Sequence, residues 1–497
     1  MISGFPTNIL IAIAVFLYFA MAVLPCRAAG RETPVPDFQF TAQAPTRAIT
    51  LREAVDTALR NYPAIAQKQF KLRAAKGGVT LAKTQYLPNL NIDIQESEIT
   101  GNRVASVVMN NVSGFDTVPV DSGPPSQRSS LRPLQNNLQG LNFNWLLIDQ
   151  GLRHANDNYA YADARAARAD VNLVKLDVAF DVANAFLTAA AAKQVIVSTQ
   201  AALEHMKAAD VRARTLVSQG LRPAVDTADW DYEVSKAKIA LIKAEKDRRV
   251  ALAELAEKMG TAAADVDIIS DPIISHPTVD VPFHAATDLS AHPLSLLKTA
   301  EVSRWRAKEV VLDKAYRPHL WLNASLWGKG SNDSVNPIRP VGGGVLPQVF
   351  NYMVGLSYSF PFMEYFPLKA QKEIARSNEN AAKADYNLAI QILEKKDVRA
   401  RIELAQAKKV ADETPILVEA ARVREIKVSK RYSTGLTNMV SLADAEKALA
   451  SAQVEDAIAQ IDVWRSILAL SYVQGDLRPF LQLVDLMQGS NQTRQGS

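Results

Sequence analysis

The sequence is nearly free of cysteine, because Cys26 is the single one in 497 residues. This excludes a disulfide framework, a cysteine-ligated zinc site and a CxxC redox pair. The six histidines show no HxH or HxxxH spacing, so no metal site is predicted. The GxGxxG, P-loop, GxSxG and HExxH motifs are also missing. We therefore expect no enzyme activity and no cofactor.

The chain also lacks a charge excess, since 56 Lys and Arg stand against 52 Asp and Glu. A surplus of +4 is too small for a nucleic-acid-binding surface. Only 21 glycines and 24 prolines occur, which excludes collagen-like and low-complexity chains. With 48% apolar residues the chain is typical of folded proteins, and its length favours several folding units or one elongated unit.

The N-terminus carries no charged side chain but has an apolar run at residues 9–24. This run is shorter than the roughly 20 residues that cross a membrane, so it predicts a signal peptide over residues 1–28, cleaved after Ala28. An uncleaved anchor helix and a lipid-accepting Cys26 remain alternatives. Residues 29–48 are then a linker with the prolines Pro34, Pro36 and Pro45.

The rest of the chain is a tandem duplication. Two early landmarks, NYP at 61–63 and YLPNL at 86–90, recur 230 residues later as AHP and YRPHL. Later landmarks recur at an offset of 215, among them Gly220-Leu221 with Gly435-Leu436, and Gly260 with Gly475. The 15-residue difference between the two offsets falls between residues 90 and 140, so it lies in one loop.

Each copy opens with an amphipathic helix. In the first copy the helical spacing is kept by Leu51, Ala54, Val55, Ala58 and Leu59. Thr50 and Glu53 have the spacing of a capping box. Pro88 disfavours a helical conformation in the residue before it, so we expect one helix that ends near Tyr86.

Two segments in which apolar and polar residues alternate follow in each copy. They predict strands at about 89–99 and 137–147, and at about 319–328 and 351–361. Their polar positions are small and hydrophilic, and their apolar positions are rich in aromatic residues. Four such strands in a secreted chain are typical of a membrane barrel with lipid outside and water inside. The stretches 101–130 and 328–348 between them predict long exposed loops.

Very long helices come after each strand pair. Residues 151–222 contain no proline, and at 1.5 Å per residue they could extend about 100 Å before returning to Met259. The second copy predicts a helix over 368–435 that returns to about Val473. Pro415 predicts either a kink or a restart capped by Thr414. Helices of this length need partners to bury their apolar stripes.

Four strands cannot close a water-filled barrel, because the smallest outer-membrane barrels have eight. Open strand edges are not tolerated in lipid. The strands therefore predict a barrel that is shared between subunits.

The order of these features resembles the TolC-type outer-membrane efflux channels. The resemblance covers roughly residues 49–480 and depends on the duplicated helix–strand–strand–helix–helix plan, on YLPNL at 86–90 and on WLLIDQG at 145–151. The paired tips, QGL at 219–221 and TGL at 434–436, also fit. The family implies a homotrimer with a twelve-stranded transmembrane β-barrel and a long α-helical barrel in the periplasm. It also implies a periplasmic adaptor protein and an inner-membrane pump.

This resemblance divides the chain into two repeats. The first repeat covers residues 49–260, an inter-repeat equatorial segment covers 261–285, and the second repeat covers 286–475. Residues 476–497 are expected to be a C-terminal tail. The implied function is a passive exit duct in the outer membrane. A membrane-anchored coiled-coil scaffold without a pore is the alternative, but it leaves the alternating strands unexplained.

The resemblance also implies site residues at the helix tips. Gly220, Leu221, Gly435 and Leu436 would dock the adaptor. Candidates for a periplasmic gate are Asp226, Tyr432, Ser441 and Asp444. Two positions depart from the family pattern. Ser441 stands where the family has an acidic residue, and Thr437 stands where it has an arginine. Arg222 has the equivalent place after the first tip. Nothing in the sequence identifies the cargo.

Overall fold

The computed structural model describes residues 48–100, 133–220, 223–261, 267–270, 288–332 and 345–495. The predicted signal peptide, nearly all of the linker and the predicted loop 101–130 lie outside these ranges. The chain divides into two compact units. Unit 1 contains residues 79–159 and 307–374, and unit 2 contains residues 39–78, 160–306 and 375–497.

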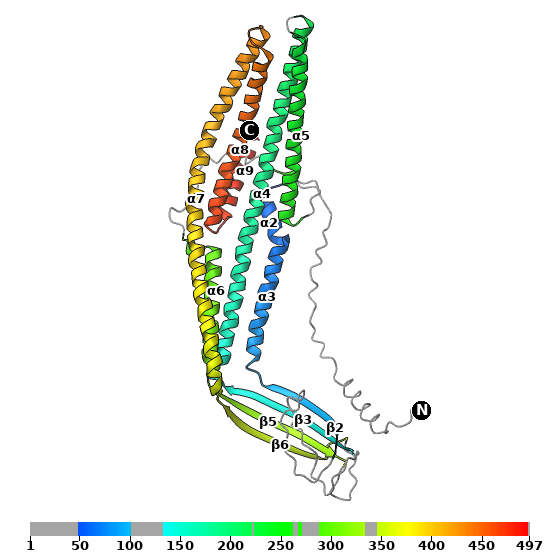
Figure 1. Ribbon diagram of the computed structural model, residues 1–497, viewed down its shortest axis with the longest axis vertical. Coiled ribbons are helices and arrows are strands. Elements are labelled where there is room, and N and C mark those ends of the chain that lie inside the picture. Colours follow the sequence, from blue (N-terminus) through cyan, green and yellow to red (C-terminus); the bar gives the residue numbers. More distant parts are fainter. Residues whose placement is uncertain are drawn as a thin grey trace, which may run out of the picture. The chain divides into compact units, whose positions relative to one another are not determined.

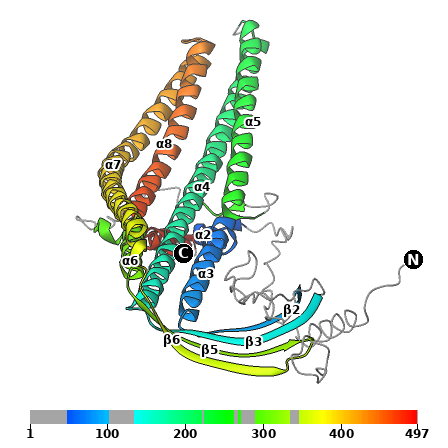
Figure 2. The ribbon, with the colours of Figure 1, turned by 60° about the horizontal axis from the view of Figure 1, so that its bottom comes forward.

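Unit 1 is built around one antiparallel sheet. Its strands are β2 (Asn89–Thr100), β3 (Pro133–Ile148), β5 (His319–Ser331) and β6 (Val349–Ser359), hydrogen-bonded in the order β2-β3-β5-β6. Figures 1 and 2 show the four strands side by side in a curved sheet. The predicted loop at 328–348 begins too early, because Gly328 and Lys329 still pair with Phe350 and Val349.

The register of the sheet brings the apolar positions of all four strands onto one face. Ile92 lies opposite Leu141, which lies opposite Leu326, which lies opposite Tyr352. The other face carries a polar network, in which Ser325 Oγ donates to Asn142 Oδ1 at 2.6 Å. The alternation predicted from the sequence therefore produces a sheet with one apolar and one polar face.

Four long helices follow the strands. They are α4 (Leu152–Ser218), α5 (Val225–Met259), α7 (Tyr365–Ser433) and α8 (Met439–Val473). None of the helices in the described ranges is long and apolar enough to cross a membrane. In unit 2, α4 with α5 forms one hairpin and α7 with α8 forms a second (Figure 1).

Helix α7 continues through Pro415, so the predicted restart at Thr414 is wrong. Thr414 does not cap a helix. Its hydroxyl group donates instead to Asp456 Oδ1 on α8 at 2.7 Å. Proline removes one backbone hydrogen bond from a helix interior, and the carbonyl oxygen left free by Pro415, that of Ala411, accepts a hydrogen bond from Gln460 Nε2 of α8 at 3.2 Å.

The opening helix of the first repeat is split, contrary to the prediction of one continuous helix. Helix α2 (Leu51–Asn61) begins at the predicted Thr50–Glu53 capping box, which is confirmed. It ends at Tyr62, whose backbone is extended with ψ 123°, and α3 (Pro63–Thr84) begins at the next residue. Proline favours the first position of a helix and restricts the residue before it, which explains the break.

The second repeat contains the same break. A short 3-10 helix, η3 (Leu289–Ala291), ends at His292, and α6 (Pro293–Ala315) begins at the following proline. The recurring NYP and AHP landmarks therefore mark the two helix breaks.

The main core of unit 2 includes the C-terminal segment, which was predicted as a tail. Residues 478–495 form a helix, α9 (Arg478–Gln495). Phe480 is buried and packs edge-on against Trp464 of α8, with ring centroids 6.2 Å apart. Nearby, β1 (Ala48–Ile49) pairs in parallel with β4 (Asp267–Ile268). The sequence reasoning missed α9.

Two equivalent glycines pack against the two helix breaks. Gly260 and Gly475 follow α5 and α8 and have positive φ values of 67° and 79°. A Cβ atom on Gly260 would lie 3.1 Å from the carbonyl oxygen of Asn61. On Gly475 it would lie 2.9 Å from Pro293 Cδ and 3.3 Å from His292 Cα. The duplicated glycines therefore provide both a left-handed turn and room for the facing backbone.

We expect Gly475→Ala to destabilise unit 2 by roughly 2–4 kcal/mol, because left-handed strain and a steric clash act together. Gly435→Ala is the matched control. Gly435 has a φ of 80°, but nothing lies within 4 Å of its Cβ position, so only the strain of roughly 1–2 kcal/mol remains. Denaturant unfolding of the purified variants measures both values. Equal destabilisation by the two substitutions would contradict the packing role of Gly475.

Candidate functional site

The turns between the long helices carry the two predicted tip glycines. Gly220 and Gly435 adopt φ values of 75° and 80°, and each would meet open space with an added Cβ. A glycine in the left-handed backbone conformation ends the first helix of each hairpin, α4 or α7, and lets the chain reverse direction. Leu436 is 69% exposed. Leu221 and Arg222 lie outside the described residues.

Behind the turns, the two hairpins share one apolar cluster, which we name the tip cluster. Trp230 of α5 is fully buried in it. Its other buried members come from α4, α5, α7 and α8: Leu203, Met206, Ala209, Ala213, Val234, Tyr432, Met439, Leu442 and Ala443. The cluster stabilises the packing of the first hairpin against the second.

Two predicted gate residues meet at the tip cluster. Tyr432 of α7 is buried, and its hydroxyl group donates to Asp226 Oδ2 at 3.3 Å. Asp226 belongs to the first turn of α5 and is also buried. Residues that are 206 positions apart in the sequence are thus hydrogen-bonded, and this bond joins the two hairpins.

The other two predicted gate residues lie apart from this bond. Asp444 is exposed on α8. Ser441 belongs to the start of the same helix, where its backbone N–H and its hydroxyl group both donate to Asn438 Oδ1, at 3.0 and 2.8 Å. Asn438 is the N-cap residue of α8. Ser441 therefore takes part in capping.

Two further polar bonds join the hairpins, and the sequence reasoning missed both. Lys447 Nζ of α8 donates to Glu233 Oε1 of α5 at 2.6 Å. Arg212 of α4 donates to the hydroxyl group of Ser429 on α7 at 3.3 Å. Single charged residues on long helices give no signal in a sequence, because most of them face solvent.

Glu446 is a further residue that was missed, although its position carried a signal. It is 3% exposed and lies on the buried stripe of α8, spaced seven residues from Met439 and three from Leu449. A carboxyl group at a stripe position of a helix is unusual, because burial disfavours its charged form. Its position within the buried stripe would have identified Glu446, whereas the family resemblance pointed to Asp444, two residues earlier on the same helix.

Three of the polar contacts near the tips join the two hairpins: Tyr432–Asp226, Lys447–Glu233 and Arg212–Ser429. Within the described ranges, no group of three His, Cys, Asp or Glu side chains is arranged to hold a metal ion. Chemically, the arrangement provides hydrogen bonds and an ion pair that can form and break between the two hairpins.

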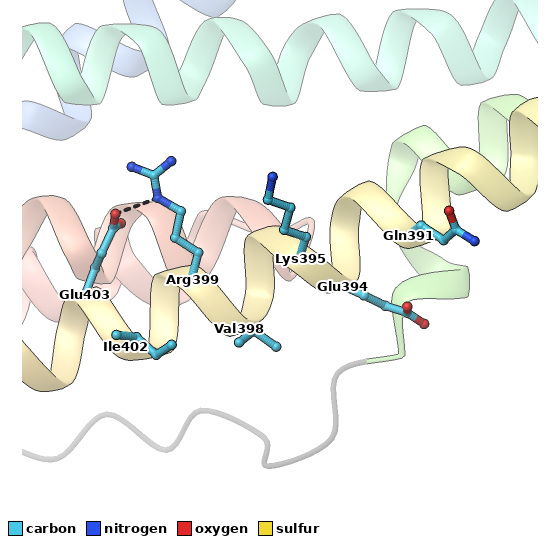
Figure 3. Close-up of a pocket in the computed structure, with 7 residues that line it drawn as sticks. All are labelled: Gln391, Glu394, Lys395, Val398, Arg399, Ile402 and Glu403. Carbon is cyan, nitrogen blue, oxygen red and sulfur yellow. Dashed lines mark hydrogen bonds and ion pairs between the residues drawn. The ribbon is translucent and has the colours of Figure 1, made fainter.

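Helix α7 also exposes a shallow groove along its own surface (Figure 3). Val398 and Ile402 project from one side of the helix, and each is more than half exposed. Lys395 and Arg399 point to the other side, where Arg399 Nε donates to Glu403 Oε1 at 2.6 Å. The two exposed apolar side chains, Val398 and Ile402, are typical of a helix face that packs against another helix.

Comparison with known proteins finds a match to one family model over part of the chain. Residues 54–261 match the family model described as outer membrane efflux protein. Protein CyaE of Bordetella pertussis is 26% identical over 224 residues, which are 44% of this chain and 40% of that protein. The match thus spans less than half of the length of this curated relative.

The fold is shared with solved outer-membrane channels over most of the chain. VceC of Vibrio cholerae has a TM-score of 0.68 at 16% identity, covering 86% of this chain and 96% of that one. CmeC of Campylobacter jejuni has a TM-score of 0.67 at 14% identity, covering 86% and 85%. MtrE of Neisseria gonorrhoeae has a TM-score of 0.64 at 17% identity, covering 86% and 89%.

Proposed function

We propose that this chain, which resembles outer-membrane efflux channels in the sequence of its first repeat and in its fold, forms a passive exit duct. The duct lies in the outer membrane and extends into the periplasm. An inner-membrane pump and a periplasmic adaptor protein supply the cargo and the energy. The chain itself performs no catalysis.

The apolar face of the sheet is the observation that carries this proposal. Ile92 is 75% exposed and Tyr352 is 81% exposed, and the register places both in one row of apolar side chains. Large apolar side chains continue along this face: Leu90, Ile94, Leu141, Trp145, Leu326, Phe350, Val354, Leu356 and Tyr358. A contiguous apolar surface of this kind marks contact with lipid or with another protein. The polar opposite face then faces a water-filled lumen.

The edges of the sheet support a homotrimer. In the sheet order, β2 and β6 are the outermost strands, so each has one side without a strand partner in the described ranges. Such edges do not occur in lipid. Three copies, each with four strands, would join edge to edge in a twelve-stranded barrel. The exposed Val398 and Ile402 on α7 give the helices an apolar surface for the same association.

The tips support docking of the adaptor. Leu436 and Val440 are both more than half exposed at the second tip, and an added Cβ atom on either tip glycine would meet open space. We assign Gly220, Leu221, Gly435 and Leu436 to this surface. In this topology the tips face the inner membrane, and the segments 101–130 and 332–348 between paired strands face the cell exterior.

The gate consists of the Tyr432–Asp226 bond together with a ring of three Asp444 carboxylates, one from each subunit. Like charges held close together in a constriction attract cations. Ser441 adds no charge to this ring, so multivalent cations bind there through Asp444 alone.

Single-channel recording on purified protein tests the duct and its gate together. We expect stepwise, cation-selective conductance that multivalent cations block. Asp444→Asn removes three carboxylates from the ring, so the block should weaken by about tenfold or more. Asp462→Asn, on the same helix and in an ion pair with Arg465, is the control and should leave the block unchanged. An absence of conductance steps would contradict the duct, and an unaltered block in Asp444→Asn would contradict the ring.

The alternative function is that of a coiled-coil scaffold without a pore. It accounts for the long hairpins and requires no lipid-facing sheet. The exposed apolar face favours the duct, because a scaffold in water would leave those side chains uncovered.

A further inference from the structure

A buried carboxyl group lies between the two hairpins, outside the predicted gate. Glu446 of α8 is 3% exposed, and its Oε1 atom is buried without a hydrogen-bond partner. Its Oε2 atom lies 3.9 Å from Nδ1 of His205 on α4. A buried carboxylate requires several hydrogen bonds or a close cation, and neither is present here in full.

The charged groups that face Glu446 come from α4 and α7. Helix α7 contributes Glu425, a second carboxyl group whose charge disfavours ionisation of Glu446. Helix α4 contributes His205 and Arg212. Lys447, the next residue on α8, does not neutralise Glu446, because it is bonded to Glu233 of α5.

Two carboxyl groups that share a site cannot both be ionised without strong repulsion. One proton shared by Glu425 and Glu446 removes the repulsion and permits a hydrogen bond between α7 and α8. The same proton leaves Glu446 neutral at its buried position against α4, where a charge would be costly.

We propose that Glu446, with Glu425 and His205, is a proton-operated latch that holds the second hairpin against the first. Binding of one proton keeps α8 packed against α4. Loss of that proton drives Glu446 toward water and favours separation of the hairpins. The latch would regulate opening of the proposed gate, so its biological role rests on the proposed function. Its protonation chemistry depends only on these three residues.

The direction of the pH effect follows from linkage. Burial and the neighbouring Glu425 raise the pKa of Glu446 from its ordinary value of 4.5 to about 7. The packed state is therefore fully stabilised below pH 4.5 and loses this stabilisation as the pH rises to about 7. Within this window the equilibrium constant for separation should rise by about tenfold per pH unit, to a total of about 300-fold.

The test measures the distance between the hairpins and does not require transport. In a Cys26→Ser background, spin labels are attached at Gln219→Cys and Thr434→Cys, two exposed positions at the two tips. Electron–electron double resonance on the purified protein then gives the distance distribution from pH 5 to pH 8. We expect the longer-distance population to grow as the pH rises.

Substitutions separate the latch from other titrating groups. Glu446→Gln keeps the shape and cannot ionise, so the short distance should persist at every pH. Glu425→Gln should move the transition to lower pH, because the repelling charge is gone. Glu419→Gln removes an exposed carboxylate of α7 that pairs with Arg422, and it should behave like the parent protein.

An infrared pH titration of the purified protein provides a second measurement. The carbonyl band of a protonated carboxyl group should disappear near pH 7 in the parent protein and should be missing in Glu446→Gln. Distances that do not change with pH in the parent protein, or a pH response that persists in a folded Glu446→Gln, would overturn the latch. Because neither readout is conductance, failure of the latch and failure of the duct are distinguished.

Discussion

Val354→Arg is expected to remove the protein from the outer membrane. Val354 is the central residue of the apolar row on β6 and is 68% exposed. An arginine on the lipid face near the middle of the bilayer costs about 2–4 kcal/mol, and a trimer would bear this cost three times. We expect folded protein in outer-membrane fractions to fall by tenfold or more, as measured by immunoblotting of unheated samples.

Met353→Arg is the matched control, because it adds the same side chain one residue earlier. Met353 lies opposite Ser325 on the polar face of the sheet and is 50% exposed. An arginine there would face the water-filled lumen, so the amount of membrane protein should remain near that of the parent. Equal loss in both variants would show that the two faces are equivalent, contrary to the lipid assignment.

The double variant Leu221→Asp with Leu436→Asp is expected to abolish export while leaving trimers in the membrane. Each leucine follows a tip glycine, and Leu436 is largely exposed. A charge in the centre of an apolar docking contact typically costs 2 kcal/mol or more, about a thirtyfold loss of affinity. Export is measured by the accumulation of cargo in cells, and assembly by the amount of trimer.

Ser218→Asp with Ser433→Asp is the control for this variant. Each serine lies two residues before its tip glycine and is exposed, so the same charges are added to the same tips. Export should continue in the control. Normal export in the leucine variant would contradict the docking role, and loss of export in both variants would point to a general effect of negative charge.

Much of the fold could be predicted from the sequence, because its determinants are local and repeated. Apolar alternation determines which face of each strand is apolar, and the register then aligned Ile92 with Leu141 and Leu326. The recurring glycines, Gly220 with Gly435 and Gly260 with Gly475, marked the ends of the long helices in both repeats. The helix break at Pro63 was missed, although proline favours the first position of a helix and the same landmark recurs at Pro293.

The site was less predictable, because its bonds join residues that are far apart in the sequence. Asp226 and Tyr432 were predicted from the resemblance to the channel family, and a hydrogen bond joins them. Lys447 and Glu233 carry no such signal, since only the packing of α8 on α5 makes them neighbours. The role of Asp444 depends on other subunits, so it stays a prediction.

The number of chains in the particle tests the central claim most directly, because one sheet of four strands is proposed to be a third of a barrel. Native mass spectrometry of protein extracted from outer-membrane fractions measures this number. We predict a mass three times that of the mature chain. A monomer, a dimer, or a chain recovered only outside the outer-membrane fraction would contradict the shared barrel and the duct built on it.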